Sequence, residues 1–308
     1  MPLLPYTYIS NGIEPNDPRH RSFGSVMRDN LRQDYGRIDE FLRERGIAPS
    51  ATARYSHQRR IVDDFFQDGI VPEDEGKARA LLSALVDLSQ VWAVISTYSD
   101  VRKLPTNFRT ALFCDPHQHL LGAASKGRDT LMEYYAGSRL KAAGCDVRRD
   151  EPDLICTFDG LEFGVAVKRF KIENLERHVR KARDQIDVAR RPGLIVMDVT
   201  QSSPLMEKPF FGRVDEYRAA AWDWTEQHLF KPLRRNWKAW GLDRRKIPYV
   251  IAFHHGVCFD GMTFYKLSQM YYFCTDPVAP PSISESKMID TLYRMVEVMR
   301  RTLPEASD

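Results

Sequence analysis

The sequence predicts an α/β protein in which a mixed sheet flanked by helices follows a helical N-terminal region. Three observations support this prediction. Apolar residues recur at helical spacing through the first third of the chain. From residue 127 onward, β-prone runs alternate with amphipathic helical runs. The pair Asp159-Gly160 lies between two β-prone runs and is typical of a two-residue hairpin turn.

Residues 1–118 are expected to form the helical N-terminal region, after an irregular arm of about 20 residues rich in Pro, Asn and Gly. Helices are predicted at 25–45, 57–68 and 73–98. The region shows no helix-turn-helix with a short turn, no glycine-rich phosphate loop and no repeat. We therefore expect it to serve targeting, regulation or self-association, either in a homodimer or with a partner protein.

Residues 119–308 are expected to form a second domain, which begins with a helix at 128–143. Strands follow at 153–158 and 161–169, a helix at 173–190 and a strand at 194–200. The C-terminal elaboration adds a helix, two β-rich runs and a closing helix, at 214–238, 248–259, 263–274 and 285–302.

Composition and charge exclude several classes of protein. The five cysteines are scattered and form no CxxC pair, which predicts a reducing cytoplasm and no zinc site. No run approaches about 18 consecutive apolar residues, so no membrane partner is expected. The net charge of +3 over 308 residues is too small to indicate a polyanion partner by itself. No GxSxG elbow is present, which argues against acyl-transfer chemistry.

The hairpin turn at Asp159-Gly160 fixes a register with chemical consequences. If Phe158 pairs with Leu161, Asp153 falls opposite position 166, with the two Cβ atoms about 5 Å apart on one face. Lys168 then lies one pair further along, roughly 7–8 Å away on the diagonal. The hairpin therefore brings a carboxylate, position 166 and an amine together.

The preceding helix places a further carboxylate on its packing side. Glu133 shares one face with Ala136, Gly137 and Leu140, at i, i+3, i+4 and i+7. An unpaired charge is costly to bury, so a metal ion or a cationic partner is expected to compensate it. Hydrated Mg²⁺ is the candidate, because the small residues Ala136 and Gly137 leave room for it.

These residues resemble the catalytic core of the PD-(D/E)XK nucleases, over residues 128–200. The resemblance rests on Glu133 in a helix, on Pro152-Asp153 at the start of a strand, and on the run 165–169, Val-Ala-Val-Lys-Arg, in the next strand. It implies a restriction endonuclease-like fold and a cytoplasmic endonuclease, with DNA as the expected substrate and bacterial defence against phage as the expected role. Mg²⁺, or Mn²⁺ in its place, would be held by Glu133 and Asp153.

The same resemblance assigns catalytic roles to Glu133, Asp153, position 166, Lys168 and Gln185. Lys168 would orient or deprotonate the attacking water. Gln185 resembles a glutamine that some branches of the family carry on the helix after the lysine, although a solvated polar residue is the simpler interpretation of it.

The family has Glu or Asp two residues before the lysine, whereas this chain has Ala166. Three explanations remain open. Ala166 is an introduced inactivating change, or the carboxylate has moved to another element, or the chain is a natural non-catalytic protein that binds nucleic acid or acts as a scaffold. For the second explanation, Glu162 lies about 13 Å from position 166 along the strand, which is too far to replace the missing carboxylate. Asp184 points outward, and Asp187 flanks the apolar stripe of its helix.

Two basic segments are candidates for holding the nucleic-acid backbone, with the alternative that they are merely solvated. Arg169, Arg177 and Lys181 come from the second strand and the helix after it, and the second segment contributes Arg234, Arg235 and Lys238. Trp237 and Trp240 either stack on bases or belong to the core. The histidines at 117, 119, 254 and 255 show no metal-site spacing and are expected to have packing or surface roles.

Overall fold

The computed structural model describes residues 25–68, 71–99, 106–114, 126–169, 172–260, 263–276 and 278–302. The expected N-terminal arm, together with His117 and His119, lies outside these residues. The protein is an α/β structure with a mixed seven-stranded sheet, as the sequence predicted at this level.

The N-terminal region is helical, as predicted. It consists of α1 (Ser25–Glu44), α2 (Arg54–Asp68), α3 (Glu75–Thr97) and α4 (Thr106–Phe113). The short helix α4 was not predicted. Asp74 caps α3, because its side chain accepts a hydrogen bond from the Lys77 amide at 2.8 Å.

Helix α3 is long and apolar enough to cross a membrane by length and composition alone, but 67% of the tested window is buried inside the protein. It packs against α5 and β6, which makes it a core helix. The helix is therefore compatible with a soluble protein.

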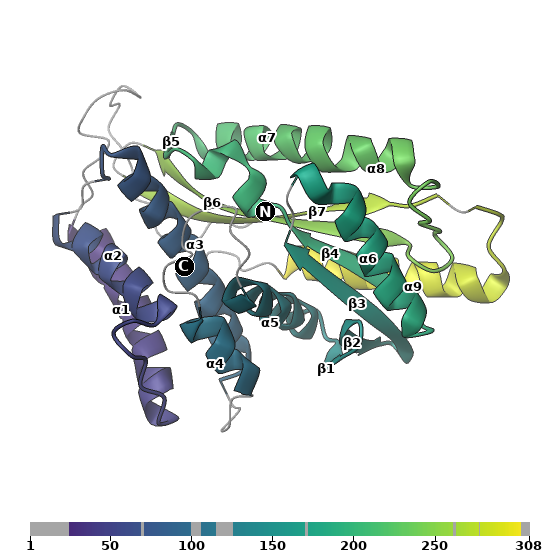
Figure 1. Ribbon diagram of the computed structural model, residues 1–308, viewed down its shortest axis with the longest axis horizontal. Helices are drawn as coiled ribbons and strands as arrows, with labels where there is room; N and C mark the ends of the chain where they lie inside the picture. Colours follow the sequence, from purple (N-terminus) through teal and green to yellow (C-terminus); the bar gives the residue numbers. More distant parts are fainter. Residues whose placement is uncertain are drawn as a thin grey trace.

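The sheet begins with an antiparallel meander and continues with parallel strands (Figure 1). Strands β1, β2 and β3 are antiparallel neighbours, whereas β3, β4 and β6 run parallel. Strand β6 also pairs with β5 in parallel and with β7 in antiparallel fashion. The strand bounds are β1 Asp146–Asp150, β2 Asp153–Phe158, β3 Leu161–Arg169, β4 Gly193–Asp198, β5 Phe210–Phe211, β6 Tyr249–Asp260 and β7 Thr263–Cys274.

Helices cover both faces of the sheet (Figure 1). Helices α3 and α5 (Lys126–Ala142) lie on one side, and α6 (Leu175–Val188), α7 (Val214–Thr225) and α8 (Lys231–Asn236) on the other. The predicted single helix at 214–238 is divided by a π-helical turn, Glu226–Phe230, between α7 and α8. Helix α9 (Ile283–Arg301) closes the chain behind a Ser282–Glu285 capping box.

Side chains alternate between the two faces of each strand, and this alternation builds two cores. On β3, Val165 and Val167 join the larger apolar cluster, whereas Ala166 joins the cluster beneath α6 and α8. The larger cluster extends from Tyr35 in α1 to Met299 in α9. The N-terminal helices and the sheet therefore share one core.

The predicted hairpin is present with the predicted register. Phe158 pairs with Leu161, and the pairing continues to Leu154 and Val165. Asp159 and Gly160 both have positive φ, 48° and 76°. This backbone is that of the turn that Asp-Gly pairs favour, so the turn chemistry alone aligned the two strands.

Replacing Gly160 by alanine is expected to lower the free energy of unfolding by about 1–2 kcal/mol, because an L side chain is strained in left-handed backbone. Gly36 offers the opposite control, since it lies within α1 with open space around its Cα. Gly36→Ala should stabilise the protein by about 0.5–1 kcal/mol. Urea unfolding measures both. A neutral Gly160→Ala change would contradict the assigned turn.

Candidate active site

The hairpin brings Asp153 and Lys168 into direct contact. The Lys168 Nζ donates to Asp153 Oδ2 at 2.8 Å, and the Val167 amide donates to the same oxygen at 2.7 Å. The side chains of Lys168 and Asp153 are 11% and 16% exposed. Their burial is partial, so the pair can be reached from solvent while contacts between β2 and β3 hold it in place.

Ala166 lies on the α6 side of β3. It is completely buried and belongs to the apolar cluster that contains Val179, Ala182 and Ile186 of α6. The register carries Asp153 toward position 166, since Leu154 pairs with Val165. A longer side chain at 166 would therefore start from the α6 side of β3, next to Asp153.

Gln185 of α6 also reaches this site. Its Nε2 donates to the Pro152 carbonyl at 2.8 Å and approaches Asp153 Oδ1 at 3.5 Å. The Gln185 Oε1 is buried and has no hydrogen-bond partner among the described residues. An orphaned acceptor beside a carboxylate is a natural contact for a water molecule or a cation.

Glu133 faces the protein and not bulk solvent, but its nearest partner is a cation of the chain. Arg149 of β1 donates to Glu133, whose side chain is 21% exposed. Burial raises the pKa of Glu133, and the charge of Arg149 lowers it. Asp153 and Lys168 also act on this pKa, upward and downward respectively, so Glu133 lies within electrostatic reach of the hairpin pair.

The candidate replacement carboxylates lie elsewhere. Glu162 pairs with Thr157, as predicted, and forms ion pairs with Arg148 and Arg191. Asp187 forms an ion pair with Lys246 at 3.0 Å. In the part of the chain that the structure describes, no three His, Cys, Asp or Glu side chains gather closely enough to hold a metal ion.

The two basic segments lie side by side. Arg180 and Arg183 of α6 donate to the carbonyls of Ala239 and Trp240, both at 2.9 Å. Exposed cations of both segments, Arg177, Lys181, Arg235 and Lys238, thus belong to neighbouring surfaces. Arg234 is exposed as well but is paired with Glu226.

His178 lies near Lys168 of the candidate site and near the cations Arg177 and Lys181 of its own helix. Burial lowers its pKa, and the charges of Arg177, Lys168 and Lys181 lower it further. Lys168, Arg177 and Lys181 therefore lie close enough to act on one imidazole. The sequence offered no reason to select His178, because its proximity to Lys168 depends on how α6 crosses β3.

Trp237 and Trp240 are both 7% exposed and pack in the cluster under α6. Of the two interpretations, stacking on bases does not apply, because their indoles fill the core between α6 and the sheet. The alternative, that they belong to the core, is confirmed.

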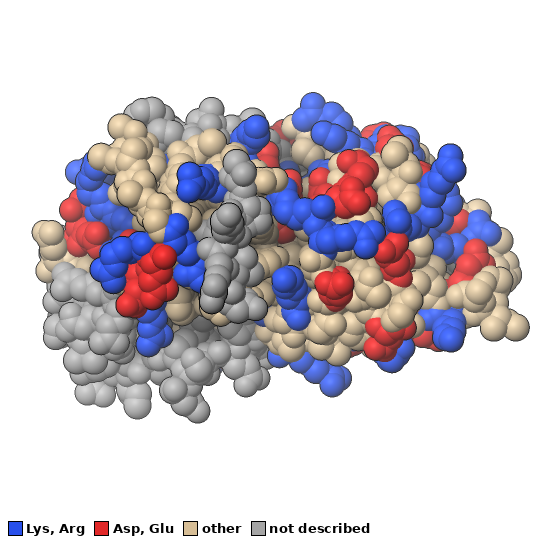
Figure 2. All heavy atoms as spheres, turned by 90° about the horizontal axis from the view of Figure 1, so that it is seen from below, with Lys and Arg blue, Asp and Glu red and all other residues tan. Residues whose placement is uncertain are grey.

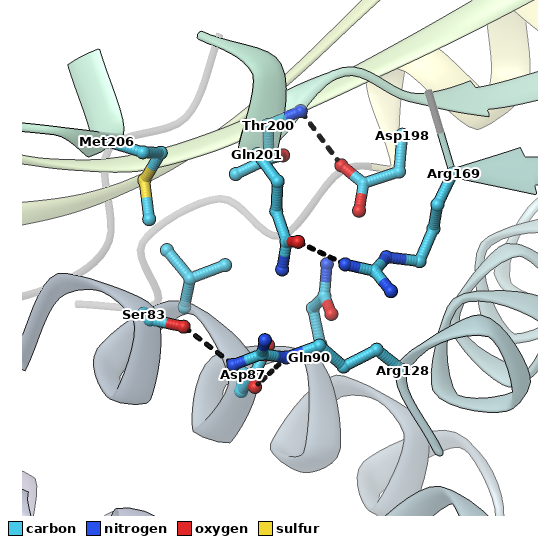
Figure 3. A pocket seen from close by; sticks show the side chains of 10 residues that line it. Ser83, Asp87, Gln90, Arg128, Arg169, Asp198, Thr200, Gln201 and Met206 are labelled. Carbon is cyan, nitrogen blue, oxygen red and sulfur yellow. Dashed lines mark hydrogen bonds and ion pairs between the residues drawn. The ribbon is translucent and has the colours of Figure 1, made fainter. Parts of the chain in front are cut away.

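Arg169 follows Lys168 but points to the opposite face of the sheet. It donates to Asp129 at 3.1 Å and to Gln201. Figure 3 shows it at one side of an enclosed polar cavity, opposite Asp87 and Arg128. The partners of Arg169 are therefore residues of the protein itself. Only 12% of its side chain is exposed, which leaves little surface for contact with nucleic acid.

Beside the cavity, α3 carries a buried charge cluster that the sequence analysis missed. The Asp87 carboxylate accepts from Arg54 at 2.8 Å, from Arg128 Nε at 3.0 Å and from Gln58. All four side chains are buried. No charge-pattern rule pairs residues 33 and 41 positions apart, so only the packing of α2, α3 and α5 reveals this cluster.

The face shown in Figure 2 carries basic and acidic side chains interspersed with one another. No extended patch of a single sign is visible there among the described residues. On this face the mixture of signs agrees with the small net charge of the chain.

His254 and His255 are buried on opposite faces of β6, which fits the predicted packing role. Neither ring nitrogen of His254 has a hydrogen-bond partner among the described residues. His255 Nδ1 lies 3.0 Å from Ser268 Oγ. Burial is the largest cause that lowers each pKa to about 3, and the charge of Arg139 contributes to the lowering for His255.

The free energy of unfolding is expected to fall as the pH drops below 6.5. A histidine whose pKa is lower in the folded protein than in the unfolded chain contributes its full stabilisation at pH values above the unfolded-state pKa. This contribution is lost progressively as the pH falls from the unfolded-state pKa toward the folded-state pKa. The loss is up to about 1.4 kcal/mol per pH unit for each histidine. Urea unfolding at several pH values should show a shallower slope for His254→Phe than for the parent chain. Identical slopes would contradict this assignment.

Comparisons with known proteins found no match: no protein-family model, no curated protein and no solved structure matches the chain.

Proposed function

We propose that the chain is a PD-(D/E)XK-type nuclease core for nucleic acid, most simply a cytoplasmic DNA endonuclease, inactive as it stands because position 166 carries alanine. One observation carries the proposal: the hairpin register places Asp153 against Lys168 and next to position 166. The order α5, β1, β2, β3, α6, β4 is consistent with a restriction endonuclease-like core. A role in defence against phage extends the same proposal.

The oxygen donors around Asp153 suit a hard divalent cation such as Mg²⁺. The orphaned Gln185 Oε1 is available, and Asp153 Oδ1 has only the long 3.5 Å contact from Gln185 Nε2, whereas Asp153 Oδ2 is occupied by Lys168 and the Val167 amide. Asp153, a carboxylate restored at position 166 and Glu133 would hold the ion. Such an ion supplies an activated water and neutralises charge on the phosphate.

The chain's own residues would do the remaining work. Lys168, fixed by Asp153 and the Val167 carbonyl at 2.9 Å, is placed to hold or deprotonate the attacking water. Gln185 would fix the Asp153 carboxylate against Pro152. Arg177 and Lys181, exposed on α6, would contact the phosphate backbone and orient it.

A plasmid-cutting assay tests the proposal. The Ala166→Glu protein should nick or linearise plasmid DNA in Mg²⁺ and not in EDTA, while the parent chain leaves it intact. The added side chain should cost about 1–3 kcal/mol, because position 166 is closely packed. Ala166→Asp is the shorter alternative if Ala166→Glu does not fold. Folded protein of both variants without cleavage would refute the proposal.

A second function has one specific observation in its favour. Asp153 and Glu133 are each already neutralised by a cation of the chain, Lys168 and Arg149. A protein that binds nucleic acid or acts as a scaffold without cutting requires no more than this. It predicts that both position-166 variants remain inactive while a labelled DNA duplex still binds in EDTA.

A further inference from the structure

Arg149 is the residue at the candidate site that the proposed mechanism leaves without a role. It comes from β1, which the sequence analysis did not predict, and its guanidinium is bonded to Glu133. The guanidinium also lies over the Tyr134 ring, 4.6 Å from the centroid. The Arg149 side chain is 29% exposed, so one side of the ion pair meets solvent.

Arg149 is the cation that is paired with the partly buried Glu133. Burial is the largest influence on the pKa of Glu133 and raises it, and the charge of Arg149 is the next and lowers it. Asp153 adds a repulsive negative charge. Without Arg149, this partly buried carboxylate would favour another cation in its place.

A divalent cation at Glu133 would compete for the carboxylate that Arg149 occupies. The released guanidinium would remain at the rim of the site because it is stacked on Tyr134. A guanidinium fork matches the oxygens of a phosphodiester group. Metal binding would therefore free a phosphate-binding side chain beside the cleaved strand.

We propose that Arg149 is an exchangeable counter-ion, bound to Glu133 in the metal-free protein and to a nucleic-acid phosphate once a divalent cation takes Glu133. The inference rests on the proposed function in that Glu133 is assigned to the metal. It makes the binding of divalent cation and of nucleic acid mutually favourable, as linkage requires. It also means that the cation alone binds weakly, since it must first displace Arg149.

Calorimetric titration with Mn²⁺ tests the first half of the exchange on full-length protein with Ala166 retained. Arg149→Met should bind Mn²⁺ about tenfold more tightly than the parent chain. The matched control is Arg148→Met, which removes the neighbouring arginine, paired with Glu162 and exposed, and should change nothing. Adding Glu133→Gln to Arg149→Met should abolish the gain. Unchanged or weaker Mn²⁺ binding by folded Arg149→Met would overturn the inference.

Fluorescence anisotropy with a labelled DNA duplex tests the second half. Mn²⁺ should tighten duplex binding by the parent chain severalfold. The affinity of the Arg149→Met protein for the duplex should be the same with and without Mn²⁺. Equal tightening in both proteins would exclude the phosphate contact. Neither measurement requires cleavage, so folded but inactive Ala166→Glu and Ala166→Asp proteins would refute the nuclease proposal without deciding the role of Arg149.

Discussion

Cleavage by the Ala166→Glu protein is expected to fall roughly 100- to 10,000-fold when Lys168 is also replaced by alanine, the range for a positioned proton-transfer group. Lys168 is fixed at 2.8 Å from Asp153 and is only 11% exposed. In the proposed mechanism, its removal would deprive the attacking water of its partner. The measurement is the initial rate of plasmid nicking under saturating Mg²⁺.

Lys181→Ala is the matched control for that experiment, because it removes an exposed lysine from α6 on the same side of the sheet. It should weaken DNA binding and the salt dependence of that binding while leaving the saturated rate nearly unchanged. A Lys168→Ala protein that still cuts at an undiminished rate would assign the chemistry to another group.

The largest effect on stability is expected at Asp87. Its carboxylate is the shared partner of Arg54, Arg128 and Gln58, all buried with it. Asp87→Ala would leave two guanidinium groups buried without compensation, which costs about 3–5 kcal/mol. Burial already lowers the pKa of Arg54 to about 10, which shows how costly its charge is in this place.

Urea unfolding of Asp87→Ala and Asp87→Asn measures this contribution. Asp87→Asn keeps hydrogen-bonding capacity without the charge and should lose less, which leaves a folded variant if Asp87→Ala does not fold. The control is Lys208→Ala, since the Lys208–Glu75 pair is exposed and should contribute under about 1 kcal/mol. Equal effects at Asp87 and Lys208 would contradict a structural role for the buried cluster.

The elements that the sequence predicted well have strong local signals. Asp159-Gly160 fixed the hairpin, and the apolar spacing of α3 and α6 revealed their buried faces. Strand β1 was missed because its sequence, Asp-Val-Arg-Arg-Asp, shows one apolar residue and no alternation. As an edge strand it needs few apolar contacts, and its charges are typical of protected sheet edges.

The candidate site likewise contains residues that the sequence could place and residues that it could not. Asp153, position 166 and Lys168 could be placed together because one turn determines their register. Arg149 could not be found, since its contact with Glu133 depends on the unpredicted strand β1. Arg169 differs from the expectation for a similar reason: the alternation of β3 turns it away from Lys168, toward Asp129 and Gln201. Tertiary contacts across 16 to 41 residues leave no periodic pattern in a sequence.

The central claim is that one carboxylate at position 166 completes a divalent-cation site on the hairpin. The most direct measurement is an anomalous difference map from crystals of the Ala166→Glu protein grown with Mn²⁺. The account predicts a peak in contact with Asp153 and the introduced carboxylate, with Arg149 turned away from Glu133. A map with no peak beside Asp153, in a protein whose hairpin is intact, would contradict the claim.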